Sequence, residues 1–126
     1  MSINVVEASA TPDDYIRVAA TVTDEKSSIN KVYAFAHSTR LSNPDVNEIL
    51  AFIQANPNAV VTMFNPTSGD TSSSPPPTSF EVIGFIRKVI TAYPNPDTVD
   101  VNASNTYHVY IVTQNNLGYN QVWEST

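Results

Sequence analysis

The 126-residue chain contains no cysteine, three glycines, two histidines and only six lysine and arginine residues. Without cysteine, the chain cannot form disulfides, thiolate nucleophiles, cysteine-bound zinc sites or iron–sulfur clusters. Three glycines are too few for a phosphate-cradling loop. No apolar run reaches the length of about 18 residues that a transmembrane helix needs, so membrane insertion is not expected. These absences exclude several functions without selecting one.

Acidic residues outnumber basic ones by twelve to six, which gives a net charge of −6 and a pI near 4.5. Nucleic acids and anionic membranes are bound through clustered cations. In this sequence Arg87 and Lys88 are the only adjacent basic pair. We therefore expect neither nucleic acid nor a membrane as a partner. Residues 1–7 lack a leader pattern, so we expect synthesis in the cytoplasm without a signal peptide.

The composition is that of a folded protein. Hydrophobic residues make up 41% of the chain and charged residues 14%, whereas disordered chains combine low hydrophobicity with high net charge. The length favours a single domain over residues 1–126.

Alternation of apolar and polar residues dominates the sequence and predicts β-strands. In residues 15–23 the residues Ile16, Val18, Ala20 and Val22 share one face, which is typical of a half-buried strand. Further strands are predicted over residues 3–8, 29–37, 59–64, 80–93, 106–113 and 119–123, with a short piece at 99–101. Within 80–93, Gly84 indicates a bulge or a close backbone approach.

Residues 43–55 break this pattern and predict one amphipathic helix. Its apolar residues recur at intervals of three and four, with Phe52 on the flank; they are Val46, Ile49, Leu50 and Ile53. Asn56 and Pro57 end the helix, because proline disfavours helical geometry at the preceding residue. We expect this helix to cover an edge or an open end of the sheets. Residues 65–79, rich in serine and proline, are predicted to form a surface loop.

Together, these elements predict a mainly β fold. Short strands at turn-marked intervals are typical of a sandwich or barrel. A parallel doubly wound sheet is not expected, because the strands and helices do not alternate regularly.

The C-terminal third has a distinctive spacing. Val101 lies six residues before Tyr107, Val109 and Ile111 then alternate, and Asn115 and Gly118 follow at the last predicted turn. This pattern resembles the end of a fibronectin type III or related immunoglobulin-like module. The resemblance implies that Tyr107 forms a tyrosine corner, with its hydroxyl bonded to a backbone group a few residues upstream. It also implies that Gly118 helps to close the final hairpin.

The resemblance is good over residues 97–124, weaker over 1–37 and absent over 40–60. The tryptophan that fibronectin-type modules carry on their second strand is missing, with Ala20 or Val22 near its place. The helix has no counterpart in the simplest members. We therefore expect a divergent immunoglobulin-like antiparallel β-sandwich of about seven strands, with one inserted helix at about 43–55.

Neither a catalytic residue nor a cofactor is assigned. His37 and His108 are the only histidines, and zinc sites usually need three or four ligands in one place. We expect both histidines on a solvent-facing or partner-facing side. A Ser-His-Asp arrangement remains open, but the G-x-S-x-G nucleophile motif is absent. The fold itself implies no activity, so we do not expect an enzyme.

Calcium is an open alternative that we do not favour. Carboxylates gather at predicted strand ends, where immunoglobulin-like modules sometimes bind calcium; they are Asp13, Asp14, Asp24, Glu25, Asp97 and Asp100, with Asn102 beside them. The EF-hand spacing is absent. Acidic residues are also common in turns, since they hydrogen-bond to the local backbone.

Several aromatic residues can gather on one sheet face. The candidate interface residues are Tyr33, Phe35, Tyr110, Tyr119 and Trp123, with Val112 among them. One interpretation buries them in the core or under the helix, and another leaves them exposed as a protein interface, where tyrosine and tryptophan are enriched. A third interpretation is that the exposed aromatic rings stack on sugars.

The leading hypothesis is a non-enzymatic structural module that acts through protein–protein contacts in a homo- or hetero-oligomeric assembly. A minor capsid, decoration or tail component of a virus or phage particle is one setting that such a chain suits. The alternative is a β-sandwich that binds carbohydrate or another small ligand through its aromatic face.

Overall fold

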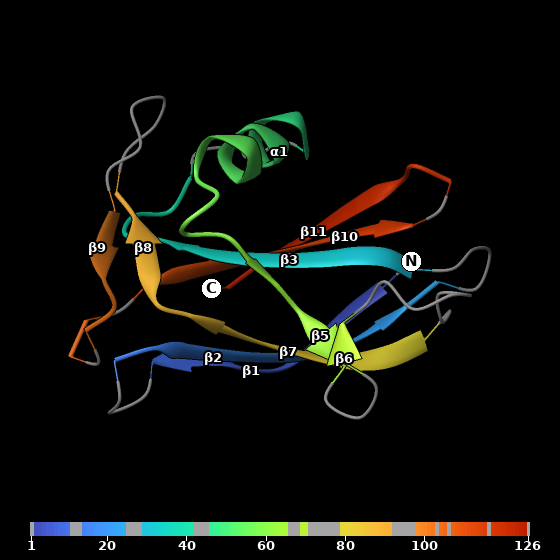
Figure 1. The fold of residues 1–126 in the computed structure, drawn as a ribbon, viewed down its shortest axis with the longest axis horizontal. Coiled ribbons are helices and arrows are strands. Elements are labelled where there is room, and N and C mark those ends of the chain that lie inside the picture. The colour runs from blue at the N-terminus through green and yellow to red at the C-terminus, as the bar shows by residue number, and fades with distance from the viewer. Residues whose placement is uncertain are drawn as a thin grey trace.

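The computed structural model describes residues 2–10, 14–24, 29–41, 46–65, 69–70, 79–91, 98–102, 104–105, 107–115 and 117–125. Within these residues, two sheets and one helix form (Figure 1). The strands are β1 Ser2–Ala10, β2 Ile16–Thr23, β3 Ile29–His37, β4 Val61–Thr62, β5 Phe64–Asn65, β6 Gly69–Asp70, β7 Ser79–Ile86, β8 Lys88–Ile90, β9 Thr98–Asp100, β10 His108–Asn115 and β11 Asn120–Glu124. The helix α1 spans Val46–Ala55. The predicted mainly β class with one helix is confirmed, but the predicted count of about seven strands is too low.

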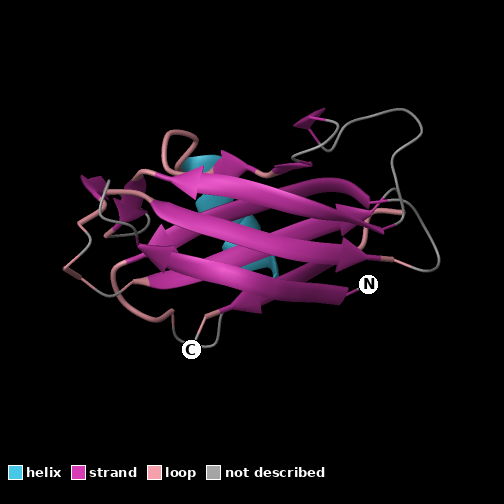
Figure 2. Ribbon diagram, turned by 90° about the horizontal axis from the view of Figure 1, so that it is seen from below, coloured by secondary structure: helices cyan, strands magenta, loops and turns pink. Residues whose placement is uncertain are grey.

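The first sheet has the strand order β1-β2-β7-β5-β6, and the second has β11-β10-β3-β8-β9, with β4 also paired to β3. All pairings are antiparallel except that of β3 with β8. The sheets lie one above the other in Figure 1, and their strands run in different directions in Figure 2. The fold is therefore built from two layers of mostly antiparallel strands.

The main core lies between the two layers. The alternation in β2 points Ile16, Val18, Ala20 and Val22 inward, and each is at most 2% exposed. They pack against Ala34 and other residues of the second sheet in one continuous cluster. The predicted buried face of this strand is confirmed. Burial of such side chains supplies the dominant favourable term in folding.

The predicted strand over residues 59–64 is instead two short strands in different sheets. Val61 pairs with Ala34 in the second sheet, whereas Phe64 pairs with Ile83 in the first. Met63 lies between them, fully buried, and its N–H donates to the Val32 carbonyl at 2.8 Å. The chain thus crosses the core at Met63.

The predicted long strand over residues 80–93 is divided in the same way. β7 belongs to the first sheet, and after the exposed Arg87 the chain joins the second sheet as β8. Gly84 causes no bulge, since the β2–β7 register is continuous. A Cβ at Gly84 would lie 3.0 Å from Cγ of Met63. Gly84 therefore allows the close approach of the crossing segment.

The helix covers the outer face of the second sheet, not an edge or an open end as predicted (Figure 1). Ile49 and Phe52 of the helix are fully buried, and the Phe52 ring stacks on Phe35 with centroids 6.0 Å apart. Phe52 is thus central to the contact and not on its flank. The helix ends before Asn56, whose side chain donates to the Phe52 carbonyl. Among the described residues, no helix is long and apolar enough to cross a membrane.

Candidate functional site

The aromatic residues considered as an interface do not share one face: some lie under α1 and one packs between the sheets. Phe35 and Tyr110 are 0% exposed beneath α1, with their rings stacked at a centroid distance of 5.1 Å. Tyr33 is half-buried. Trp123 lies opposite Ile111 in the β10–β11 register and packs into the core between the sheets. Phe35 and Tyr110 are therefore unavailable to a partner or a sugar. For Phe35, Tyr110 and Trp123 the structure agrees with the interpretation that buries the aromatic residues under the helix or in the core.

The hydroxyl of Tyr110 has a structural role. It accepts a hydrogen bond at 3.0 Å from the N–H of Leu41, in the segment that precedes the helix. Burial raises the pKa of the Tyr110 hydroxyl, and the Glu124 carboxylate adds to the increase. The hydroxyl therefore stays protonated and anchors the chain beside the helix-covered face.

The two histidines lie side by side, because His37 pairs directly with His108 across β3 and β10. His37 is only 5% exposed and its ring packs perpendicular to that of Phe52, so the prediction that it faces solvent or a partner is wrong. Its Nδ1 accepts a hydrogen bond from the N–H of Thr39 at 3.1 Å. Burial lowers the pKa of His37; the hydrogen bond with the Thr39 backbone partly opposes this decrease, and the neighbouring His108 adds to it. The neutral ring thus carries its proton on Nε2.

His37 is poorly suited to act as a base or a metal ligand, because its Nδ1 lone pair already accepts the hydrogen bond from Thr39. Within the described part of the chain, no group of three or more histidine, aspartate or glutamate side chains is placed to hold a metal ion.

The acidic residues considered for calcium make separate contacts with other parts of the chain. Asp24 is buried and accepts a hydrogen bond from the side chain of Asn115, while Asp100 forms an ion pair with Lys88. Asp14 adopts a positive φ of 60° in the turn before β2. Asp13, Glu25 and Asp97 lie outside the described residues.

Tyr107 lies half-buried against the core between the sheets. Its hydroxyl accepts a hydrogen bond at 3.0 Å from the N–H of Asn102, five residues upstream. The side chain of Asn105 donates to the same hydroxyl at 3.4 Å. Val101 is 2% exposed. The backbone contact that the resemblance implied is present.

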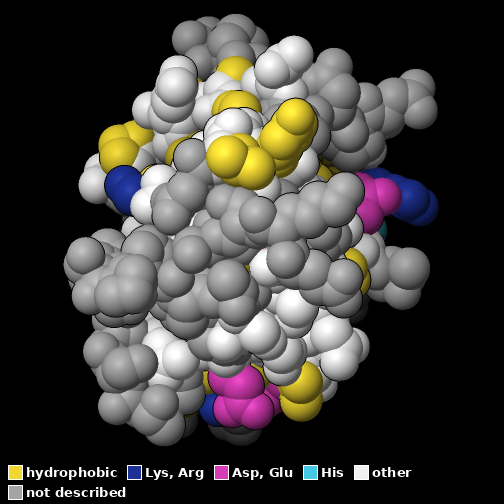
Figure 3. Space-filling view, turned by 90° about the vertical axis from the view of Figure 1, so that its right-hand side faces the viewer, with side chains coloured by type: hydrophobic (Ala, Val, Ile, Leu, Met, Phe, Trp, Pro, Cys, Tyr) yellow, Lys and Arg dark blue, Asp and Glu magenta, His cyan; other side chains and the backbone are white. Residues whose placement is uncertain are grey.

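The hairpin between β10 and β11 holds apolar side chains in solvent. Leu117 is 65% exposed and Tyr119 is 68% exposed. Figure 3 views this end of the molecule, and hydrophobic side chains protrude there. Gly118 lies between them with a φ of 87°, a conformation that favours glycine. We name this feature, residues 117–119, the hairpin tip.

One side chain fixes the hairpin tip. Asn115 accepts hydrogen bonds through Oδ1 from the N–H groups of Leu117 and Tyr119, each at 3.0 Å. Its Nδ2 donates at 2.7 Å to Oδ2 of Asp24, where β2 ends. Both Asn115 and Asp24 are buried. A buried polar pair therefore ties the tip to the first sheet. Of the five interface residues predicted from the sequence, only Tyr119 is largely exposed.

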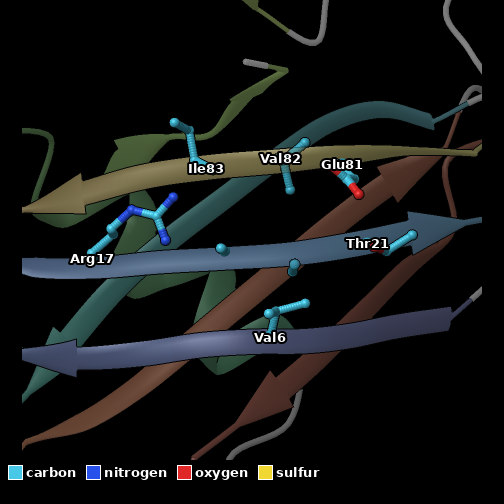
Figure 4. Close-up of a pocket in the computed structure, with 8 residues that line it drawn as sticks. Val6, Arg17, Thr21, Glu81, Val82 and Ile83 are labelled. Carbon is cyan, nitrogen blue, oxygen red and sulfur yellow. The ribbon is translucent and has the colours of Figure 1, made fainter. Parts of the chain in front are cut away.

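The outer face of the first sheet carries a second candidate surface, which the sequence did not suggest. A shallow hollow of about 260 Å³ opens there, lined by Val6, Arg17, Ala19, Ala20, Thr21, Glu81, Val82 and Ile83 (Figure 4). These residues come from β1, β2 and β7. The register of β1 against β2 shifts between Val5 and Glu7, and Val6 is 75% exposed at this shift. A protruding valine thus stands at the rim of the hollow.

No protein family, curated protein or solved structure matches this chain. Its function must therefore be inferred from the surfaces described above.

Proposed function

We propose that this chain is a divergent immunoglobulin-like β-sandwich module that is not an enzyme and binds another protein through the hairpin tip. The strand order supports the module. Immunoglobulin domains have strands A, B, E and D in one sheet and C, F and G in the other. The order β1-β2-β7-β5 corresponds to A-B-E-D, and β3, β10 and β11 correspond to C, F and G. The helix and the parallel strand β8 are the departures.

One observation carries the binding proposal: a buried hydrogen-bonded pair fixes a turn that exposes two large apolar side chains. In the isolated chain the apolar side chains of Leu117 and Tyr119 are in contact with water, because each is about two-thirds exposed. Burying one such side chain in a partner's pocket contributes about 1.5–3 kcal/mol. Since Asn115 already holds the turn, binding orders little additional chain.

Tyrosine is enriched among the hot-spot residues of protein interfaces. The carbohydrate alternative has weaker support, because Phe35 and Tyr110 lie under the helix. A component of a virus or phage particle stays a prediction for the assembly in which such a module works.

Site-specific photo-crosslinking in the cells that make the protein tests the proposal. A benzophenone amino acid at Tyr119 is expected to give a discrete adduct with another protein. The same group at Gln54, an exposed position on the helix, serves as the matched control and is expected to give none. Leu117→Asp is expected to abolish the Tyr119 adduct.

Identical adducts from both positions, or none from Tyr119, would contradict the proposal. An adduct with twice the mass of the chain would also contradict it, because the partner would then be a second copy.

A further inference from the structure

We propose that the outer face of the first sheet pairs with the same face of a second copy of this chain. The surface in question, here called the open face, is the side of β1, β2, β7 and β5 that points away from the core. This inference does not depend on the hairpin tip, which lies on a different surface.

The strand registers define the open face. Glu7 pairs with Ala19, Ala19 pairs with Ile83, and Ile83 pairs with Phe64, so one row of side chains crosses four strands. In the neighbouring row, Arg17 pairs with Phe85. Paired residues of adjacent strands point to the same side of a sheet. Since Ala20 and Val82 are buried in the core, their neighbours Ala19 and Ile83 face outward.

Part of the open face is apolar, on β7 and β5. Ile83, Phe85 and Phe64 lie on it and are each only partly buried. The rings of Tyr15 and Phe64 flank Phe85, with centroids 5.4 Å and 6.5 Å from it. Apolar side chains that no other element of the described chain covers make this part of the sheet a candidate interaction site.

The charges of the open face favour a second copy as the occupant. Arg17 forms an ion pair with Glu7 at 2.5 Å, and Arg87 lies over the Tyr15 ring at 5.1 Å from its centroid. Glu81 completes the set at the rim of the hollow. The face therefore carries charges of both signs on β1, β2 and β7, with Arg87 just beyond the end of β7, although the whole chain has a net charge of −6. Two copies can meet on this face without the repulsion that their net charges would cause elsewhere.

The open face has both a protruding side chain and a hollow beside it. Val6 protrudes at the rim of a hollow whose lining includes the small side chain of Ala19. A twofold contact places the same patch on both partners, so each protrusion can meet the hollow of the other copy. Val6, Arg17 and Ile83 project from three neighbouring strands around this hollow (Figure 4).

Mass measurement across a concentration series tests the pairing. The wild-type chain is expected to shift from 13.7 kDa toward twice that mass as its concentration rises. Val6→Lys and Ile83→Lys are expected to weaken the pairing at least about tenfold, as hot-spot substitutions do. Val99→Lys is the matched control, because Val99 is an exposed valine on β9, in the second sheet, and it is expected to leave the pairing unchanged.

A mixing experiment gives a second, independent measurement. One variant carries Glu7→Lys and Glu81→Lys, and another carries Arg17→Glu and Arg87→Glu. Each alone is expected to stay monomeric, because like charges then face one another, whereas an equimolar mixture is expected to form a one-to-one dimer. Thermal unfolding of each variant verifies that it is folded.

A wild-type chain that remains monomeric at its solubility limit overturns the proposal. A dimer that Val6→Lys and Ile83→Lys leave intact, or that Val99→Lys weakens equally, overturns it as well. Loss of the hairpin-tip adduct would not affect these measurements, so the two proposals can fail separately.

Discussion

The outer faces of the two sheets differ in what covers them. On the second sheet, Phe35 and Tyr110 are 0% exposed beneath α1. On the first, Phe64 and Phe85 form a comparable aromatic pair that stays partly exposed. Both sheets thus place aromatic residues on their outer sides, but only the outer side of the second sheet is buried, beneath α1. The difference indicates that strand alternation determines which residues share a face, whereas the docking of the helix determines whether that face is buried.

The largest effect is expected from truncating an aromatic ring on each face. Phe52→Ala should destabilise the chain by about 3–5 kcal/mol, because it removes the ring that fills the space between α1 and the second sheet. Phe85→Ala on the open face should cost about 1 kcal/mol or less in the monomer, since its ring is partly in solvent. Urea unfolding at low protein concentration measures both free energies. Equal losses would remove the distinction between the two faces.

A smaller effect is expected from removing a hydroxyl. Tyr110→Phe leaves the N–H of Leu41 without its acceptor and should cost about 1 kcal/mol. On the open face, Tyr15→Phe is the control and should change the free energy of unfolding by less than about 0.5 kcal/mol.

The same two variants also differ in their expected stability at alkaline pH. Because burial raises the pKa of Tyr110 in the folded chain, the unfolded chain ionises first as the pH passes 10. The stability that Tyr110 contributes is therefore present below pH 10 and lost above it. Tyr110→Phe should lose less stability between pH 9 and 11 than the wild type does. Parallel pH profiles would contradict a buried, neutral hydroxyl.

His37 extends the comparison to mildly acidic pH. Its pKa is lowered in the folded chain by burial beside Phe52, so the unfolded chain binds a proton first as the pH falls through 6.5. The contribution of His37 to stability is present above pH 6.5 and is lost as the pH falls below that value. Unfolding free energies measured from pH 7.5 to 5 should decrease less in His37→Gln than in the wild type. An unchanged slope would show that His37 is not buried as a neutral ring.

The smallest effect is expected from the ion pair of the open face. The side chains of Arg17 and Glu7 are each 37% exposed, and such pairs contribute about 0–1 kcal/mol. Glu7→Gln should therefore lower the monomer's unfolding free energy by about 0.5 kcal/mol or less, and 1 M salt should abolish the difference. A loss above about 2 kcal/mol would mean that this face behaves as a buried one.

Local features of the fold were predictable from the sequence. The alternation in residues 15–23 predicted the buried face of β2, and residues 29–37 predicted the bounds of β3. The hydrogen bond from Asn102 to Tyr107 agrees with what the resemblance of residues 97–124 to fibronectin type III modules implied. Such features depend on neighbours along the chain, so the sequence pattern contains them.

The wrong predictions share one cause, which is a dependence on distant segments. Residues 59–64 and 80–93 are continuous apolar runs, and nothing in their composition marks the change of sheet at Met63 or Arg87. The burial of His37 and Phe35 depends on where α1 docks. Trp123 faces the core because β11 pairs with β10 in the register that places it opposite Ile111. The Asp24–Asn115 bond joins residues 91 positions apart, which no local pattern reveals.

Because the chain changes sheet at Met63 and again at Arg87, each sheet is built from strands that lie far apart in the sequence, and this affects the order of folding. β3 belongs to the second sheet, but its partner β10 begins with His108, and β2 of the first sheet pairs with β7, which ends at Ile86. Neither layer is therefore complete when the first half of the polypeptide has left the ribosome. Closing such long loops slows folding. Both layers should form together, late in synthesis, so that fragments ending before β7 would expose unpaired strands and tend to aggregate.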